Sequence, residues 1–286
     1  MPNAPYRLEM PAERVTSVVF SSPHSGRDYP RDFLRGSVLD EHAVRSSEDA
    51  FVDLLFSDAP KTGAPLLAAT APRAFVDLNR SADELDPALI DGVRIAMQNP
   101  RVNSGLGVVP RVVANGRSIR SGKMSLAEAQ ARLGRYWRPY HACLQALLDE
   151  NRALFGEAIL VDCHSMPHDA TVGVARIGRP RPDVVLGDRF GASAHGAVTD
   201  RIEAAFVAAG LNVARNAPFA GAYITQHYGR PSRNQHAVQI EIDRSLYMDE
   251  QSIRPNADFR AFRHLMAGII ARISAIGCSD LPMAAE

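Results

Sequence analysis

Seven short apolar runs recur along the chain and alternate with stretches of helical periodicity. The runs are VTSVVF, PLLAA, AFVDL, AILVD, DVVLG, LNVAR and AVQIEI. Short runs rich in β-branched residues are typical of the buried strands of α/β proteins. Because strands that alternate with helices form a sheet with helices packed on its faces, the sequence predicts an α/β fold in which a sheet lies between helices.

Three segments carry the helical pattern most clearly, at about 126–153, 193–209 and 258–276. In the first, apolar residues recur at helical spacing, Ser125 can serve as the N-cap and Pro139 can kink the helix. Between about 81 and 121 the pattern weakens into a stretch rich in Gly, Pro, Asn and Arg. We expect a long functional loop or an irregular hairpin there.

Charge and composition restrict the class of partner and compartment. The chain has 286 residues, and its 32 Lys and Arg residues balance its 32 Asp and Glu residues. Zero net charge gives no field that would draw the chain to nucleic acid or to an acidic membrane, so we expect a small-molecule partner. No apolar run approaches the roughly 18 residues that a membrane span needs, and the N-terminal residues lack a signal-peptide pattern. With three scattered cysteines, Cys143, Cys163 and Cys278, these features predict a cytoplasmic protein without disulfides.

Two histidines follow predicted strands, His24 after VTSVVF and His164 after AILVD. Ligands gather at the carboxyl ends of the strands of α/β sheets, so the two imidazoles could converge at one edge. Catalytic zinc sites commonly combine two or three histidines with a carboxylate and keep one position open for water. The alternative is that each histidine only packs, or closes a turn through a backbone hydrogen bond.

The stretch RSSEDAFVDLLF supplies a candidate carboxylate. Ser47 can cap a helix whose first turn carries Glu48 and Asp49. Either acid could complete a metal site, or both could simply complement the helix dipole.

Two further stretches carry groups suited to catalysis and substrate binding. AFVDL predicts a strand with Arg73 at one end and Asn79 and Arg80 at the other. Arginines there could bind a carboxylate or stabilise an oxyanion, or they could be ordinary surface charges. Glu241 lies inside the apolar run AVQIEI, where burial should raise its pKa. It could act as a general base, or it could form a structural ion pair with Arg244.

Six motifs follow one another over nearly the whole chain, namely SSPHSGRDYP, SSEDAFVDLLF, PRAFVDLNR, VDCHSMP, NAPFAGAYITQHYGRP and QIEIDRSLYMDE. In this order they resemble the N-formylglutamate amidohydrolase family. The resemblance implies one catalytic domain over residues 1–286, with the three-layer α/β/α sandwich and mixed sheet of the phosphorylase/hydrolase-like fold that zinc carboxypeptidases and aspartoacylases share. It also implies one Zn²⁺ per chain and hydrolysis of N-formyl-L-glutamate to formate and L-glutamate, a step of amino-acid and specifically histidine degradation.

The resemblance assigns His24 and His164 as the two histidine ligands of the zinc. In zinc carboxypeptidases the acidic ligand lies three residues after the first histidine, but Arg27 occupies that position here. The acidic ligand must therefore come from elsewhere. The resemblance implies that it comes from SSEDAF, and we predict Asp49, with Glu48 as the alternative.

The remaining motifs carry substrate-binding and catalytic roles over to this chain. DLNR resembles the Asn-Arg pair that holds a substrate carboxylate in carboxypeptidases and aspartoacylases, which assigns Asn79 and Arg80 to binding. Arg73 would then polarise the scissile carbonyl, and Glu241 would act as the general base.

A glutamate side chain in the substrate requires one more cation. The candidates are Arg111 in GVVPRVV and Arg230 in HYGRP. Tyr223 and Arg230 lie in a stretch rich in Gly and aromatic residues, which could form a wall or lid over the substrate or merely a structural turn.

Two other functions are compatible with the sequence. The chain could be a related zinc amidohydrolase or carboxypeptidase-like enzyme that acts on another N-acyl amino acid or a small peptide, which a substrate panel would reveal. It could also be a non-catalytic binding protein that kept the fold, which metal analysis and a turnover assay would reveal. The sequence leaves the oligomeric state open.

Overall fold

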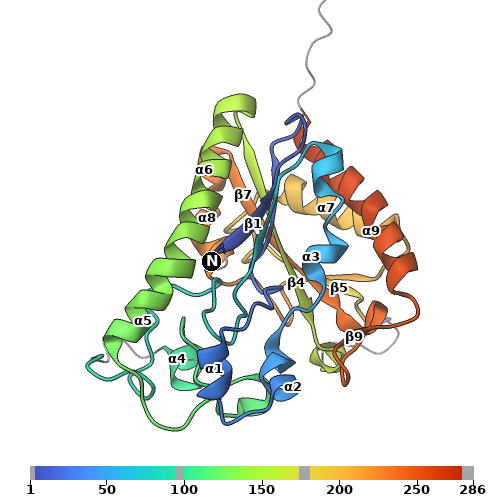
Figure 1. Cartoon of the computed structure of the whole chain (residues 1–286). Helices are drawn as coiled ribbons and strands as arrows, with labels where there is room; N and C mark the ends of the chain where they lie inside the picture. Colours follow the sequence, from blue (N-terminus) through green and yellow to red (C-terminus); the bar gives the residue numbers. More distant parts are fainter. Residues whose placement is uncertain (1–3, 95–98, 174–180, 279–286) are drawn as a thin grey trace, which may run out of the picture.

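A twisted mixed sheet runs through the middle of the molecule (Figure 1). The computed structural model describes residues 4–94, 99–173 and 181–278, and within them the sheet has seven strands in the order β1-β3-β2-β4-β7-β5-β6. The strands are β1 (Tyr6–Glu9), β2 (Val18–Ser22), β3 (Leu66–Ala69), β4 (Ala158–Met166), β5 (Val184–Gly187), β6 (Val213–Arg215) and β7 (Gln235–Asp243). A separate pair, β8 (Met248–Asp249) and β9 (Arg254–Pro255), follows β7 in the chain.

Four central strands run in one direction. β3, β2, β4 and β7 are mutually parallel, whereas β1 pairs antiparallel with β3, and β5 pairs antiparallel with β7 and parallel with β6. The carboxyl ends of β2, β4 and β7 therefore meet at one edge of the sheet, which is where ligands bind in parallel α/β sheets.

Helices cover both faces of the sheet and complete the three layers (Figure 1). The first layer contains α5 (Leu126–Arg132), α6 (Arg138–Phe155) and α8 (Tyr223–Tyr228), and the second contains α3 (Val52–Leu55), α7 (Gly196–Val207) and α9 (Phe259–Ser274). The short helices α1 (Arg31–Arg35), α2 (Glu41–Val44) and α4 (Pro100–Asn103) lie in the lower part of Figure 1. The predicted α/β/α sandwich with a mixed sheet is confirmed.

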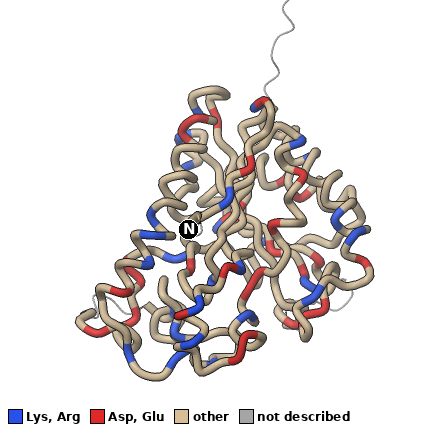
Figure 2. Tube along the Cα trace, in the orientation of Figure 1, with Lys and Arg blue, Asp and Glu red and all other residues tan. Residues whose placement is uncertain are grey.

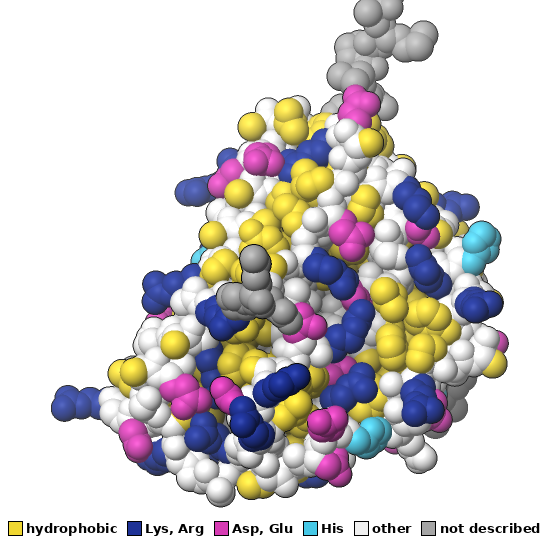
Figure 3. Space-filling view, in the orientation of Figure 1, with side chains coloured by type: hydrophobic (Ala, Val, Ile, Leu, Met, Phe, Trp, Pro, Cys, Tyr) yellow, Lys and Arg dark blue, Asp and Glu magenta, His cyan; other side chains and the backbone are white. Residues whose placement is uncertain are grey.

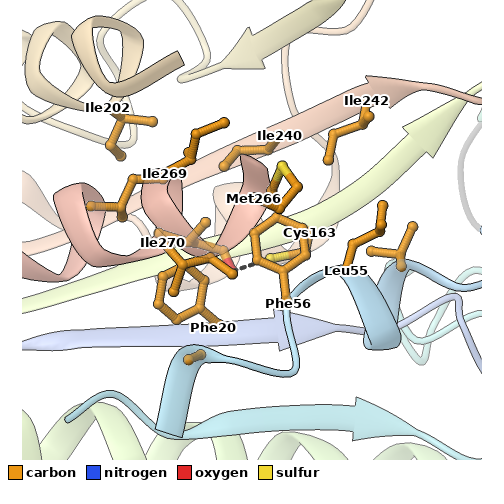
Figure 4. Packing of buried hydrophobic residues seen from close by; sticks show 14 of the residues in the cluster. Phe20, Leu55, Phe56, Cys163, Ile202, Ile240, Ile242, Met266, Ile269 and Ile270 are labelled. Atoms are coloured by element: carbon orange, nitrogen blue, oxygen red, sulfur yellow. Dashed lines mark hydrogen bonds between the residues drawn. The ribbon is translucent and has the colours of Figure 1, made fainter. Parts of the chain in front are cut away.

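Alternation along the strands divides the core between the two faces. In β4, Val161 and Cys163 pack into the apolar cluster that contains Ile269 of α9, whereas Leu160 belongs to the cluster under α6. Figure 4 shows part of the α9-side cluster, in which the Phe20 and Phe56 rings lie 5.7 Å apart between centroids. Because successive strand residues face opposite sides, the polar residues between these apolar ones must face α6 and α8.

The predicted helices are present, and the first contains an irregular turn. Residues 126–155 form α5, a π-helical turn at Leu133–Trp137 and then α6, with the Ser125 side chain accepting a hydrogen bond from the Glu128 N–H. Helices α7 and α9 lie within the other two predicted segments. The expected irregular region is also present. The described residues of 81–121 form α4, a 3₁₀ turn at Ala114–Gly116 and isolated β-bridges, but no strand.

Two local predictions were wrong. AFVDL forms a turn instead of a strand, because the Pro72 carbonyl accepts hydrogen bonds from the N–H groups of Phe75 and Val76. Ser47 does not cap a helix through Glu48 and Asp49, because the chain is extended at Glu48 and the next helix, α3, begins only after Phe51. Strand β1, on the sheet edge, was not predicted.

Charged residues are interspersed along the chain trace (Figure 2). In the space-filling view, basic, acidic and hydrophobic side chains alternate over the visible face (Figure 3). None of the helices in the described ranges combines the length and the apolar character that a membrane span requires.

The α9-side core predicts a large loss of stability on truncation. Phe56 is fully buried, so Phe56→Ala should lower the free energy of unfolding by about 3–5 kcal/mol. Leu154 on α6 is 63% exposed, and Leu154→Ala should change it by less than about 0.5 kcal/mol. Chemical denaturation followed by circular dichroism measures both, and equal losses would contradict this description of the core.

Candidate functional site

The polar ends of β4 and β7 lie side by side under the α6 layer. Val161 and Cys163 face α9, so Asp162 and His164 face the opposite side of β4. His164 pairs directly with Glu241 in the parallel register of β4 and β7. The strand pairing therefore sets an imidazole beside a carboxyl group at the carboxyl edge of the sheet.

His24, Asp49 and His164 converge at this edge. All three are buried, and each offers one ligand atom within 4.8 Å of the others. His164 Nδ1 lies 2.9 Å from Asp49 Oδ2, and His24 Nδ1 lies 3.4 Å from the same oxygen. The loop that follows β2 brings Asp49 into place, since the Asp49 N–H donates to the His24 carbonyl.

Each of the three residues also forms a hydrogen bond or an ion pair with another buried residue. His24 Nε2 donates to Asp77 Oδ1 at 2.7 Å, which leaves Nδ1 directed toward Asp49. Arg244 donates to Asp49 Oδ1 at 3.0 Å, so the other oxygen of that carboxylate faces the two imidazoles. Asp162 Oδ2 lies 3.0 Å from His164 Nε2.

This donor set fits a divalent metal such as zinc. His24 Nδ1 is a buried atom without a hydrogen-bond partner, and its lone pair could bind a cation. Two imidazole nitrogens and one carboxylate oxygen are ligands that zinc prefers, and carboxylates behind the imidazoles are a common support for such ligands. Among the described residues, His24, Asp49 and His164 form the group that could hold a metal ion.

The ionisation of the group reflects its concentrated negative charge. Burial acts to raise the pKa of Asp49, but the His164 and His24 imidazoles outweigh it and hold that pKa well below the usual range. Burial acts to lower the pKa of His164, but the charge of Asp162 and hydrogen bonding with Asp162 and Asp49 raise it well above the usual value. The site therefore attracts a cation, and a metal would compete with the proton for the imidazole nitrogen.

Glu48, the alternative acidic ligand, lies in a different network. Its Oε1 accepts hydrogen bonds from the Tyr29 hydroxyl at 2.6 Å and from Arg45 Nε at 2.9 Å. The structure thus separates the two neighbouring acids: Asp49 faces the histidines and Glu48 does not.

Glu241 is a buried acid beside the metal-ligand group. Burial raises its pKa to about 7, a change opposed by the positive charges of His164 and Arg73. Gln239 Nε2 donates to its Oε1 at 2.7 Å and thereby orients the carboxyl group. The structural ion pair with Arg244 considered above is absent from the described residues, because Arg244 binds Asp49 instead.

A cavity of about 570 Å³ opens in front of these residues. Both the metal-ligand group and Glu241 line it, together with Arg73, Asn79 and Arg80. Arg73 Nε is paired with Asp77 Oδ2 at 3.0 Å. Arg80 Nε donates to the Leu106 carbonyl at 3.0 Å.

Asn79 is already hydrogen-bonded on both sides of its amide. Nδ2 lies 3.1 Å from Asp162 Oδ2 and 3.0 Å from His164 Nε2, and Oδ1 accepts from the Ile224 N–H at 2.7 Å. Its amide therefore supports His164 and ties α8 to the site, instead of being free for a substrate carboxylate.

Helix α6 and the π-helical turn before it hold the backbone on either side of Asn79. His141 Nε2 donates to the Leu78 carbonyl at 2.9 Å, and Trp137 Nε1 donates to the Arg80 carbonyl at 2.9 Å. Trp137 ends the π-helical turn that precedes α6, and such turns recur at functional sites.

Three predicted substrate-binding residues lie outside the cavity lining. Arg111 Nε is paired with Asp86 Oδ2 at 2.8 Å. Arg230 is exposed and donates to the carbonyls of Gln226 and Gly229. Tyr223 stacks on the His227 ring instead.

Sequence reasoning missed Asp77, Asp162 and Arg244, which hold the predicted residues in place. Asp77 and Asp162 stand in the same motifs as Asn79 and His164, and each lies two residues before them. Their position in those motifs was the available signal. For Arg244 only the neighbourhood of Glu241 could have served as a signal.

Comparison with known proteins identifies the family of this chain. The family model of N-formylglutamate amidohydrolase matches residues 16–248, which include every residue of the site described above. The chain belongs to the N-formylglutamate amidohydrolase family.

Relatives support this membership over most of the chain. An N-formylglutamate deformylase from Pseudomonas aeruginosa is 34% identical over 240 residues, covering 82% of this chain and 83% of the relative. One from Pseudomonas putida is 32% identical and covers 82% of each chain. A crystal structure of N-formylglutamate amidohydrolase from Ralstonia eutropha is 35% identical, with a TM-score of 0.89 and coverage of 96% of this chain and 99% of that one. A protein from Agrobacterium tumefaciens, 19% identical with a TM-score of 0.64 and coverage of 96% of both chains, shares the fold.

The orientation of the two neighbouring acids predicts different effects on metal affinity. Asp49→Asn should weaken Zn²⁺ binding by more than about 100-fold, because loss of a ligand costs more than loss of a supporting residue. Glu48→Gln, the matched change one residue earlier, should leave Zn²⁺ affinity within about threefold, since its neighbours are Tyr29 and Arg45. Competition titration with a zinc chelator measures both, and the reverse ranking would make Glu48 the ligand.

Proposed function

We propose that this chain hydrolyses the formamide bond of N-formyl-L-glutamate, releasing formate and L-glutamate. The observation that carries the proposal is that the His24–Asp49–His164 group and the buried Glu241, which is the partner of His164 in the β4–β7 register, line one cavity. Relatives that share a third of its sequence bear the name N-formylglutamate deformylase.

One Zn²⁺ per chain is the cofactor of this proposal, with His24, Asp49 and His164 as its protein ligands. When bound, zinc would supply Lewis acidity, lowering the pKa of water toward about 7 and polarising the scissile carbonyl. The remaining chemistry belongs to the side chains of the chain itself.

Glu241 is placed to move the proton. Glu241 is buried and is the partner of His164 in the β4–β7 register, and its carboxylate form can accept a proton from the attacking water. The water oxygen adds to the formyl carbon, the C–N bond then breaks, and Glu241 returns the proton to the departing amine nitrogen. Formate and the free amino acid leave the cavity.

Arg73 and Arg80 serve different stages of the reaction in this proposal. Arg73 is oriented by Asp77 through its Nε, so its terminal nitrogens remain for the oxyanion that develops on the formyl oxygen. Arg80 is buried, has no ion-pair partner among the described residues and lines the cavity. We assign it the α-carboxylate of the substrate.

We further propose that the reaction belongs to histidine degradation, as the family resemblance implies, and that the chain acts in the cytoplasm, as its sequence pattern predicts. A deletion strain grown on histidine should accumulate N-formylglutamate, and fractionation should find the chain in the cytoplasm. Normal clearance of that compound would remove the pathway assignment while leaving the reaction itself open to direct assay.

The size of the cavity favours a second candidate function. At about 570 Å³ it falls within the range of pockets that hold drug-sized ligands, so an acyl group larger than formyl could also enter it. A related activity on other N-acyl amino acids or small peptides is therefore compatible with it. Assays across formyl, acetyl and longer acyl derivatives of glutamate would separate the two candidates.

The general-base role predicts a loss of turnover without loss of metal. Glu241→Gln should lower kcat on N-formylglutamate by about 10²-fold or more, while the bound zinc stays near one per chain. Glu157, which lies before β4 at the opposite end of that strand and contacts His236, provides the control, and Glu157→Gln should keep near-normal kcat. Formate release and metal analysis are the two measurements; near-normal activity in Glu241→Gln would place the base elsewhere.

Substitutions of Arg80 and of Arg73 should change different steady-state parameters. Arg80→Ala should raise KM by about 10- to 100-fold through loss of charge-assisted hydrogen bonds. Arg73→Ala should lower kcat by about 10²-fold or more, since an oxyanion contact forms only in the transition state. Thermal melting checks that both variants are folded. An unchanged KM in Arg80→Ala would refute its assignment to the α-carboxylate.

A further inference from the structure

Four arginines line the cavity, and they fall into two kinds. Arg73 is paired with Asp77 and Arg244 is paired with Asp49. Arg80 and Arg101 also line the cavity, yet neither forms an ion pair with any of the described residues. The cavity thus contains two guanidinium groups whose charge the described part of the protein leaves unpaired.

These two arginines are tied to each other through one residue. The Leu106 N–H donates to the Arg101 carbonyl at 2.8 Å, and the Leu106 carbonyl accepts from Arg80 Nε at 3.0 Å. Arg101 itself stands in the first turn of α4, where the Asn99 side chain accepts a hydrogen bond from its N–H. The backbone that presents Arg101 is therefore fixed relative to Arg80.

The positive charges of Arg80 and Arg101 repel each other. Burial, with the nearby charges of Arg73 and Arg101, lowers the pKa of Arg80, while Asp77 and Glu84 act in the other direction without forming an ion pair with it. An anion bound between Arg80 and Arg101 would relieve this repulsion, and a dicarboxylate could meet both guanidinium groups.

Burial decides which carboxylate each arginine would meet. The α-carboxylate of an N-formyl amino acid is bonded to the carbon that carries the scissile amide, so its partner must lie deep in the site. Arg80 is only 5% exposed and follows Asn79, which contacts His164. The side-chain carboxylate lies two methylene groups farther out, and Arg101 is exposed at the cavity wall.

We propose that Arg101 binds the side-chain carboxylate of the substrate and makes the enzyme selective for an acidic N-formyl amino acid. This inference rests on the proposed function. It replaces Arg111, which is paired with Asp86, and Arg230, which lies outside the cavity lining.

The test compares two substrates that differ only in side-chain charge. The zinc-loaded wild type, Arg101→Gln and Arg101→Lys are assayed for kcat/KM with N-formyl-L-glutamate and with N-formyl-L-glutamine. Arg31→Gln is the matched control, because Arg31 is an exposed arginine in the first turn of the short helix α1 and does not line this cavity.

We expect the wild type and Arg31→Gln to prefer the glutamate derivative by about 10- to 100-fold. Arg101→Gln should lose that preference through a higher KM for N-formylglutamate, while kcat/KM for N-formylglutamine stays within about threefold. Arg101→Lys should retain part of the preference, since it keeps the charge but not the planar fork.

The possible negative results distinguish a failure of the proposed function from a failure of the role of Arg101. A wild type that hydrolyses neither compound overturns the proposed function and this inference with it. A wild type that is active but shows no preference, or an Arg101→Gln variant that keeps the full preference, overturns the role of Arg101 alone. Equal losses on both substrates in Arg101→Gln also overturn it, because an uncharged side chain offers Arg101 no carboxylate.

Discussion

Buried negative charge at the carboxyl edge of the sheet is the constraint on which the rest of the site depends. Asp49, Asp77, Asp162 and Glu241 are all at most 7% exposed. An unpaired buried charge costs several kcal/mol, so each of these groups needs a cation, a hydrogen-bond donor or a proton. Arg73 and Arg244 satisfy part of this requirement, and the raised pKa of Glu241 reflects the part that remains. A divalent ion held by His24, Asp49 and His164 would satisfy the rest.

The sheet topology concentrates this charge at one point. β2, β4 and β7 are adjacent and parallel, so three loops leave the sheet at the same edge. The strands themselves are rigid because apolar residues on the α9 side pack them against helices. On the opposite face of the sheet, the side chains near the carboxyl ends of these strands are polar. Packing on one face thus holds the geometry of the chemistry on the other face within narrow limits.

The irregular chain between β3 and α5 supplies both supporting residues and cavity-lining arginines of the site. Asp77, Asn79, Arg80 and Arg101 all come from it, and Trp137 of the π-helical turn before α6 fixes its inner portion. Loops carried on a rigid scaffold commonly provide binding residues. The arginines of this cavity divide accordingly: Arg73 and Arg244 are paired with acids, whereas Arg80 and Arg101 form no ion pair with the described residues.

The sequence by itself determined the layers and the candidates. Apolar runs predict buried strands, so His24 could be placed directly after β2. The prediction that His164 follows its strand was wrong, because β4 continues through His164 to Met166. Tertiary structure alone decided which acid joins them: Asp49 and Glu48 are neighbours, but Arg244, 195 positions away, binds Asp49 and turns it toward the histidines. It also decided that Arg111 lies outside the cavity lining, because that outcome depends on Asp86 as its partner. A local pattern records whether a residue is buried, whereas the direction of a polar side chain depends on partners that only the folded chain brings near it.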